Sequence, residues 1–411
     1  MERPGAIFVS GLFKIACAFG SKWIQSAVPR AGLLGSLAAI ALVLISFMPL
    51  LEVLHYPVVG MISLAIILTA LVARVKLPFH MPGALGALIV AGIVYYIMLA
   101  GGLLHAEAAP FEPREALLPT GWLSVFTFSW INVLGDSLRY LPIVIPFALG
   151  TVVGGIDCTE SAKAAGDDYH AGKIIGVEGF ATVVAALCGG VIQSTPYIGH
   201  PAYKAMGGRA AYTLATALFV GSAGMLGYFG YLYFFIPKAA IFTILIFIGL
   251  EITAQSYHAT PRRHYAALAL ACVPAMAKLV TIYAGQIIGT TGSSLEVIME
   301  RNPTLAHGLQ TMQMLSGGFI VTSLLWASLL AAIIDRRLHL SGLLFLICGA
   351  CTLFGIMHSP FADEQLFWPW AIPKLPEAAA GQTPIHMAAA YCVAAALMFA
   401  WAWWLEFSGE K

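Results

Sequence analysis

The residues best suited to chemistry lie in one stretch of an otherwise apolar chain, between positions 189 and 209. This stretch contains Ser194, Thr195, His200 and Lys204, which can donate or accept hydrogen bonds or carry charge. Polar side chains at membrane depth are costly, so their presence indicates a functional site. We expect Ser194 and Thr195 to line a cavity. His200 and Lys204 are four residues apart and share a helix face, although Lys204 could also extend towards the membrane surface.

Two prolines interrupt the same stretch. Pro196 and Pro201 each lack a backbone donor and push the preceding residue towards extended conformation. We predict a short extended piece over 194–196, then a half-helix that begins near 198–201. Non-helical backbone at membrane depth occurs only where it is buried in protein or lines a cavity, and broken helices hold the substrate in many transporters.

Acidic residues upstream of the break complete the predicted site. The amino terminus of a half-helix suits a carbonyl or anionic group. Asp157 could accept hydrogen bonds from ring N–H groups, and a carboxyl removed from water also holds a coupled proton more readily. Glu160 is a second candidate. In the alternative interpretation, Asp157, Glu160 and Lys163 form a salt-bridged helix terminus, while Glu178 faces another helix or caps its own.

Composition gives the class of protein. Of 411 residues, 60% are hydrophobic and only 10% are charged, which indicates an all-α polytopic membrane protein. The net charge of +1 gives no reason to expect nucleic acid as a partner. Seven scattered cysteines do not suggest a disulfide framework, and we interpret Cys348 and Cys351 as packing residues of a spanning helix.

Apolar runs divide the chain into about a dozen membrane segments, several of them too short or too polar for ordinary spans. The clearest runs lie at about 5–25, 31–51, 57–73, 83–104, 141–156, 211–235, 239–255, 265–288, 312–334, 341–357 and 388–407. Lys14 interrupts the first of them.

The loop charges predict the orientation. If the first segment runs inwards, one side collects the basic residues Lys22, Arg30, Arg74, Lys76, Lys173, Arg209, Arg262, Arg263, Arg336 and Arg337. The other side collects Glu52, Glu107, Glu112, Glu115, Glu296, Glu300, Asp363 and Glu364. We therefore predict a multi-pass protein of the cell (inner) membrane. By the positive-inside rule, its basic loops face the cytoplasm.

The order of motifs between Asp157 and Arg209 resembles a known family. An acidic residue late in one helix is followed by an apolar Gly-containing helix, then by Ser-Thr-x-Tyr-Ile and Gly-Gly-Arg. This pattern is similar to the nucleobase:cation symporter-2 family of xanthine, uracil and ascorbate permeases, and nearest to its bacterial adenine/guanine/hypoxanthine branch. The alignable region extends from Val-Pro-Arg-Ala at 28–31 to Ile-Pro-Lys-Ala-Ala at 236–240.

The resemblance implies a 7+7 inverted-repeat fold with a core and a gate subdomain, and a possible homodimer. Substrate would lie between two half-helices and be fixed by an acidic residue at or near Asp157. Ser194, Thr195 and Tyr197 would lie on the extended piece and the start of the half-helix. On this mapping, residues 1–118 are the remaining spans of the first repeat, 119–335 the second repeat, and 336–411 extra membrane segments.

The sequence departs from the family in two respects. Gly199 and then His200 stand where the family commonly has a glutamate after the Tyr-Ile pair. The chain also corresponds to a family member that begins at its fourth span, so we expect an N-terminally incomplete fold.

Three functions fit these features. The first is an ion-coupled permease of a nucleobase-like or related small polar solute, with a proton or sodium ion as the coupling ion and no cofactor. The second is a sulfate-permease-like anion carrier or channel, which Gly199, His200 and Lys204 would favour. The third is an inactive truncated remnant. A membrane-embedded enzyme is disfavoured because the sequence contains neither H-E-x-x-H nor G-x-S-x-G.

Overall fold

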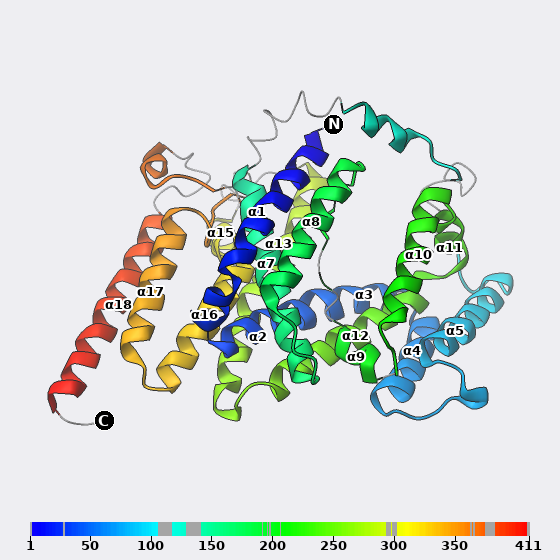
Figure 1. The fold of residues 1–411 in the computed structure, drawn as a ribbon, viewed down its shortest axis with the longest axis horizontal. Helices are drawn as coiled ribbons and strands as arrows, with labels where there is room; N and C mark the ends of the chain where they lie inside the picture. The colour runs from blue at the N-terminus through cyan, green and yellow to red at the C-terminus, as the bar shows by residue number, and fades with distance from the viewer. Residues whose placement is uncertain are drawn as a thin grey trace. The chain divides into compact units, whose positions relative to one another are not determined.

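The fold is known from a computed structural model, in which every regular element of the described part of the chain is a helix. The described residues are 2–27, 29–105, 117–128, 141–190, 192–194, 196, 199–205, 207–292, 297, 302–361, 364, 366–374 and 383–408. The all-α prediction is therefore confirmed for these residues (Figure 1).

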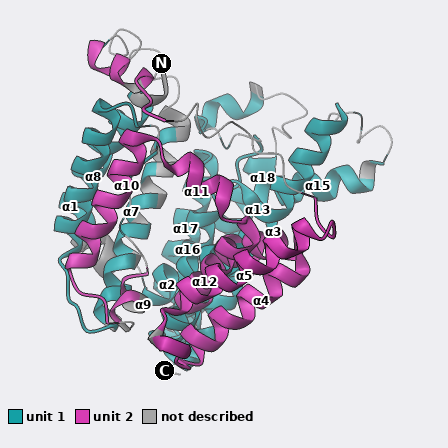
Figure 2. Ribbon diagram, turned by 90° about the vertical axis from the view of Figure 1, so that its right-hand side faces the viewer, with its two compact units in different colours: residues 1–43, 128–198, 253–411 teal, residues 44–127, 199–252 magenta. Residues whose placement is uncertain are grey.

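The chain forms two compact units, each assembled from separate stretches (Figure 2). Unit 1 comprises Met1–Val43, Phe128–Ile198 and Thr253–Lys411, and unit 2 comprises Leu44–Thr127 and Gly199–Ile252. The predicted repeat boundaries at 118 and 335 remain a prediction, because compactness does not reveal an inverted repeat.

The helices of unit 1 are α1 (Glu2–Ala27), α2 (Arg30–Ala39), α7 (Leu141–Ala164), α8 (Ala171–Leu187), η8 (Arg262–His264), α13 (Tyr265–Thr291), α15 (Pro303–Ser316), α16 (Phe319–Ile334), α17 (Leu338–Leu353), η9 (Pro369–Lys374) and α18 (Thr383–Ser408). Unit 2 contains α3 (Met48–His55), α4 (Pro57–Ile67), η2 (Leu68–Val72), η3 (Pro78–His80), α5 (Gly83–Ala100), η5 (Gly121–Thr127), α9 (His200–Ala205), α10 (Ala211–Leu226) and α11 (Phe229–Phe235). The π-helical η1 (Ile40–Phe47) and α12 (Lys238–His258) cross the division.

Five described helical runs are long and apolar enough to cross a membrane: Arg30–His55, Gly83–Ala100, Lys238–His258, Arg262–Thr291 and Thr383–Ser408. Two further pairs of helices pass the same criterion together but are sharply bent. A chain with this many apolar helices is a multi-pass membrane protein.

Two runs that the sequence predicts as single crossings are broken instead. The run at 211–235 bends by 99° between α10 and α11, and the run at 312–334 bends by 78° between α15 and α16. Both breaks have a glycine in the left-handed region, Gly227 with φ 79° and Gly318 with φ 66°. Both runs stay candidate crossings, and the sequence did not predict their bends because hydrophobicity does not register a glycine that ends a helix.

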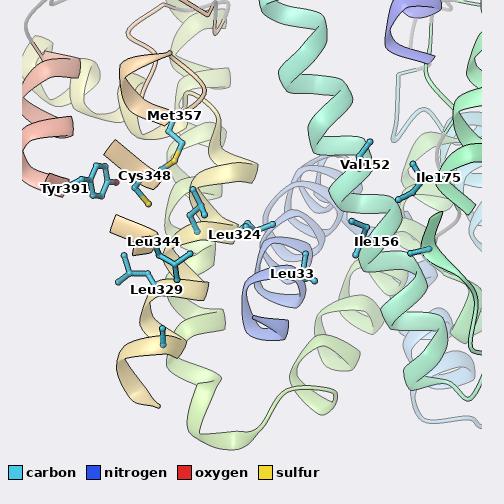
Figure 3. Close-up of a cluster of buried hydrophobic side chains, with 13 residues drawn as sticks. Leu33, Val152, Ile156, Ile175, Leu324, Leu329, Leu344, Cys348, Met357 and Tyr391 are labelled. Atoms are coloured by element: carbon cyan, nitrogen blue, oxygen red, sulfur yellow. The ribbon is translucent and has the colours of Figure 1, made fainter. Parts of the chain in front are cut away.

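A hydrophobic cluster joins six helices of unit 1 (Figure 3). Val152 and Ile156 of α7 belong to it, with Leu324 of α16 and Cys348 of α17. Its other labelled members come from α2, α8, α16, α17, α18 and the segment after α17, and are Leu33, Ile175, Leu329, Leu344, Met357 and Tyr391. This core holds α7 and α8 in fixed positions, as a site between them requires.

Helices α1 and α8 pack closely, and glycines make the approach possible. A Cβ on Gly11 would lie 2.7 Å from Val183 Cγ2, and one on Gly179 would lie 2.9 Å from the backbone nitrogen of Ile15. Small residues allow helix backbones to approach in this way in membranes. The contact brings Lys14 and Glu178, one from each helix, to the same level.

Unit 2 is centred on α4, α5 and α12. Val59, Ala91 and Ala240 are buried together. The Ser63 hydroxyl lies 2.8 Å from that of Thr243 and 3.1 Å from the carbonyl oxygen of Ala240. These bonds satisfy buried hydroxyls that would otherwise destabilise the unit.

The connection after α17 carries a buried histidine. His358 Nδ1 lies 3.2 Å from the Met314 carbonyl oxygen, and Nε2 lies 2.7 Å from the Tyr391 hydroxyl, which accepts from Trp326 Nε1 at 2.8 Å. Burial lowers the pKa of His358 to about 4. The imidazole is therefore neutral near pH 7, donating from Nδ1 and accepting at Nε2.

Cys348 and Cys351 carry no disulfide, and Cys348 is part of the hydrophobic cluster with Cys351 packed against it. This agrees with their predicted role as packing residues of a helix.

Candidate functional site

The predicted break is present. Helix α8 ends at Leu187, Gly189 adopts φ 83°, and α9 begins at His200. The described residues 192–194 and 196, which lie between Gly189 and α9, are not helical. The half-helix begins where the sequence predicted, whereas no strand is present among the described residues.

A buried ion pair between α1 and α8 also binds the non-helical residue Ser194. Lys14 Nζ lies 2.7 Å from Glu178 Oε1 and donates at 2.8 Å to the Ser194 carbonyl oxygen. The side chains of Lys14 and Glu178 are 0% and 2% exposed. Two charges removed from water are tolerated only when paired and hydrogen-bonded, so this arrangement fixes the position of Ser194.

Two threonines bond to the same piece. The Ser194 N–H donates to Thr182 Oγ1 at 3.1 Å, and this hydroxyl donates to the Glu178 carbonyl oxygen at 2.9 Å. From α7, Thr151 Oγ1 donates to Gln193 Oε1 at 3.0 Å. The backbone groups of Ser194 thus find partners on α1 and α8, as non-helical backbone in a membrane protein must, and the Gln193 side chain finds one on α7.

One oxygen of this cluster is unused. Glu178 Oε2 is buried and has no hydrogen-bond partner among the described residues. It faces α7, since a Cβ on Gly155 would lie 2.9 Å from it. A buried acceptor in this position can receive a proton or an N–H donor, because leaving it unpaired costs free energy.

The acidic candidates on α7 differ in their surroundings. Glu160 is buried, and its Oε2 accepts from Arg30 Nη2 at 2.7 Å and Nε at 3.1 Å. Lys163 instead pairs with Asp168 at 3.6 Å. The alternative of a salt-bridged helix terminus therefore holds for Glu160, with Arg30 as partner in place of Lys163. Asp157 lies on α7, two residues beyond Gly155, but its side chain lies outside the described part of the chain.

The remaining predicted residues are not all described. Thr195 and Tyr197 lie outside the described residues. Gly199 is buried and His200 begins α9, and both belong to unit 2. Within that unit, Tyr203 of α9 stacks on Tyr212 with ring centroids 4.9 Å apart. The structure thus joins Ser194 to the ion pair and Glu160 to Arg30, each within unit 1.

The sequence interpretation missed the role of Lys14. A lysine inside an apolar run was the available signal, because such a charge needs a buried partner. Glu178 was predicted to face another helix or to cap its own, and it does face α1.

A second charged pair was also missed. Lys278 of α13 pairs with Glu364, whose Oε2 accepts from the Gly318 N–H at 3.3 Å, at the bend between α15 and α16. The sequence had placed Glu364 in a loop at the acidic side. The structure makes its carboxylate a cap for the first turn of α16.

Among the described residues, no three His, Cys, Asp or Glu side chains come close enough to hold a metal ion. A comparison with known families finds no match to the chain. A comparison with curated proteins finds none either. The function must therefore be argued from the site itself.

Proposed function

We propose that this multi-pass membrane protein is an ion-coupled permease that carries a nucleobase-like or related small polar solute. The observation that carries the proposal is the non-helical backbone of the described residues between Leu187 and His200. Ser194 bonds through its backbone to groups of α1 and α8, and the Gln193 side chain accepts from Thr151 of α7. Such a break serves packing poorly and substrate binding well, because it presents backbone amides and carbonyls inside the bilayer.

The polar groups near the break support a neutral, hydrogen-bonding solute. Lys14 is neutralised by Glu178, so the buried lysine gives no net positive charge to attract an anion. The free Glu178 Oε2 and the carboxylate of Asp157 would both suit ring N–H donors or a coupling proton. The division of the chain into two compact units is also what movement of a core against a gate requires.

Uptake by reconstituted vesicles tests this proposal. Counterflow of labelled purines should be measured with the parent chain, with Asp157→Asn, and with Asp168→Asn as the control. Asp168 lies on the exposed loop after α7, with its side chain 74% exposed. We expect a loss of about tenfold or more in Asp157→Asn, since one lost charge-assisted hydrogen bond is worth that much, and parental uptake in the control.

Competition by urate, sulfate and bicarbonate separates the permease from an anion carrier. Block by urate or purines alone supports the nucleobase-like solute. Block by sulfate or bicarbonate would instead support the anion carrier, and undiminished uptake in Asp157→Asn would remove that residue from the site. If the parent chain takes up none of these solutes, the permease proposal is overturned.

A further inference from the structure

A large hollow lies away from the break, where the turn between α16 and α17 meets the last turns of α18. Its volume is about 940 Å³, and all its walls belong to unit 1. Arg336 and Arg337 line one part, and Met398, Trp401 and Leu405 line another. The hollow therefore combines a cationic part with an apolar wall.

The two arginines carry uncompensated charge. Both are exposed, and neither guanidinium has an ion-pair partner in the described part of the chain. Two acidic groups lie nearby and each has another partner, and one of them, Glu406, lines the hollow itself together with His339. Asp335 accepts from Arg263 Nε at 3.1 Å and lies 2.8 Å from His264 Nε2, while Glu406 lies 2.9 Å from His339 Nε2. An anion in the hollow would meet two guanidinium groups that no carboxylate of the described residues pairs with.

The apolar wall belongs to a helix that faces lipid. Only 22% of the apolar window of α18 is buried within the protein, and Trp401 is 52% exposed. Tryptophans cluster near this end of α18, at positions 401, 403 and 404, as is typical of the membrane–water interface. Helix α17 packs beside α18 (Figure 1).

We propose that this hollow is a binding site for an anionic phospholipid. Arg336 and Arg337 bind its phosphate, and an acyl chain lies along Met398, Trp401 and Leu405. Guanidinium groups form paired hydrogen bonds with phosphate oxygens, and basic pockets between spanning helices suit anionic headgroups. A zwitterionic lipid fits less well, because the hollow is lined by two arginines and only one carboxylate, that of Glu406, so its ammonium group would meet a net positive charge.

Lipid titration of the purified full chain tests the site. Binding of dioleoyl phosphatidylglycerol and of dioleoyl phosphatidylcholine, each in mixed micelles, is measured by native mass spectrometry. The parent is compared with Arg336→Gln/Arg337→Gln and with Arg74→Gln/Lys76→Gln, a control that removes two charges outside the hollow. We expect the parent to prefer phosphatidylglycerol, and the first variant to lose about tenfold or more of that affinity, because each surface arginine contributes measurably to anionic lipid binding.

Trp401→Gln distinguishes a lipid from a free anion. It should weaken phosphatidylglycerol binding but leave binding of inorganic phosphate unchanged. Equal binding of the two lipids, an equal loss in the control, or phosphate binding that needs the arginines but not Trp401 would each overturn the proposal. A dimer that Trp401→Gln dissociates would also overturn it, in favour of a second copy of the chain. If the double variant does not fold, Arg337→Gln and Trp401→Gln alone provide the same comparison.

Discussion

At the residue scale, the contact between Lys14 and Glu178 fixes the break. The two residues are 164 positions apart in the sequence, yet their charged atoms are 2.7 Å apart. A buried ion pair is weak evidence for stability as a whole, because desolvation offsets the attraction. Removing one partner is a different matter, since the other charge then stays buried without compensation.

This asymmetry gives a prediction for the pair. Lys14→Met and Glu178→Met should each lower the free energy of unfolding by about 3–5 kcal/mol, and the double variant should lose less than the sum. Unfolding in mixed micelles measures all three, with Lys173→Met on the same α8 as a control for losing an exposed lysine. Additive losses, or a Lys14→Met protein as stable as the parent, would contradict the assigned role.

The double variant should still not regain full stability. Lys14 also donates to the Ser194 carbonyl oxygen, and methionine cannot replace that bond. Uptake by the double variant therefore reports on the position of the extended piece, separately from the loss of charge. We expect reduced uptake even where stability is nearly restored.

At the element scale, the sequence predicted the break after α8 but missed the bend before α16. Pro196 and Pro201 predict the break after α8, because proline lacks a backbone N–H donor in any structural context. The bend at Gly317 and Gly318 depends on the segment after α17, about 40 residues further on. His358 N–H donates to the Gly317 carbonyl oxygen at 2.9 Å, and Glu364 caps Gly318. Hydrophobic periodicity carries no information about such distant partners.

Gly318 provides the prediction for this bend. An added Cβ would lie 1.9 Å from the Ile356 carbonyl oxygen, whereas at Gly292 it would meet nothing within 4 Å. The two glycines have similar φ values, 66° and 63°. Gly292→Ala should therefore lower the free energy of unfolding by only about 1 kcal/mol, the strain of an alanine in the left-handed region. Gly318→Ala should lower it clearly more. Melting temperatures of the two variants measure the difference, and equal values would show that the clash is relieved without cost.

The same reasoning explains how much of the site the sequence could predict. Ser194 was singled out because it interrupts an apolar stretch, and the structure joins it to the ion pair, whereas the role of His200 stays a prediction. Glu160 was identified too, but its partner Arg30 was not, because 130 residues separate them. Lys14 was noticed only as an interruption. Local sequence thus marks polar residues in lipid, while the fold decides which of them meet.

At the scale of the whole molecule, basic side chains gather at one end of unit 1. Arg30, His264, Asp335 and Arg337 line a common hollow of about 480 Å³. Arg263 joins them through Asp335. Helices α2, α13 and α16 therefore present their charged ends together, which is the arrangement that loop charges alone predict for a cytoplasmic face.

Labelling of introduced cysteines tests this orientation. Arg262 and Thr291 stand at opposite ends of one apolar helical run of 30 residues, and Arg337 belongs to the basic end. Arg262→Cys and Arg337→Cys should react with an impermeant maleimide only after the cell membrane is opened, and Thr291→Cys should react in intact cells. The labelling of each variant is compared with that of the parent chain, because native Cys188 and Cys392 are exposed and could also react. Labelling of Arg262→Cys in intact cells would indicate the opposite orientation. Equal labelling of Arg262→Cys and Thr291→Cys would show that this run does not cross the membrane.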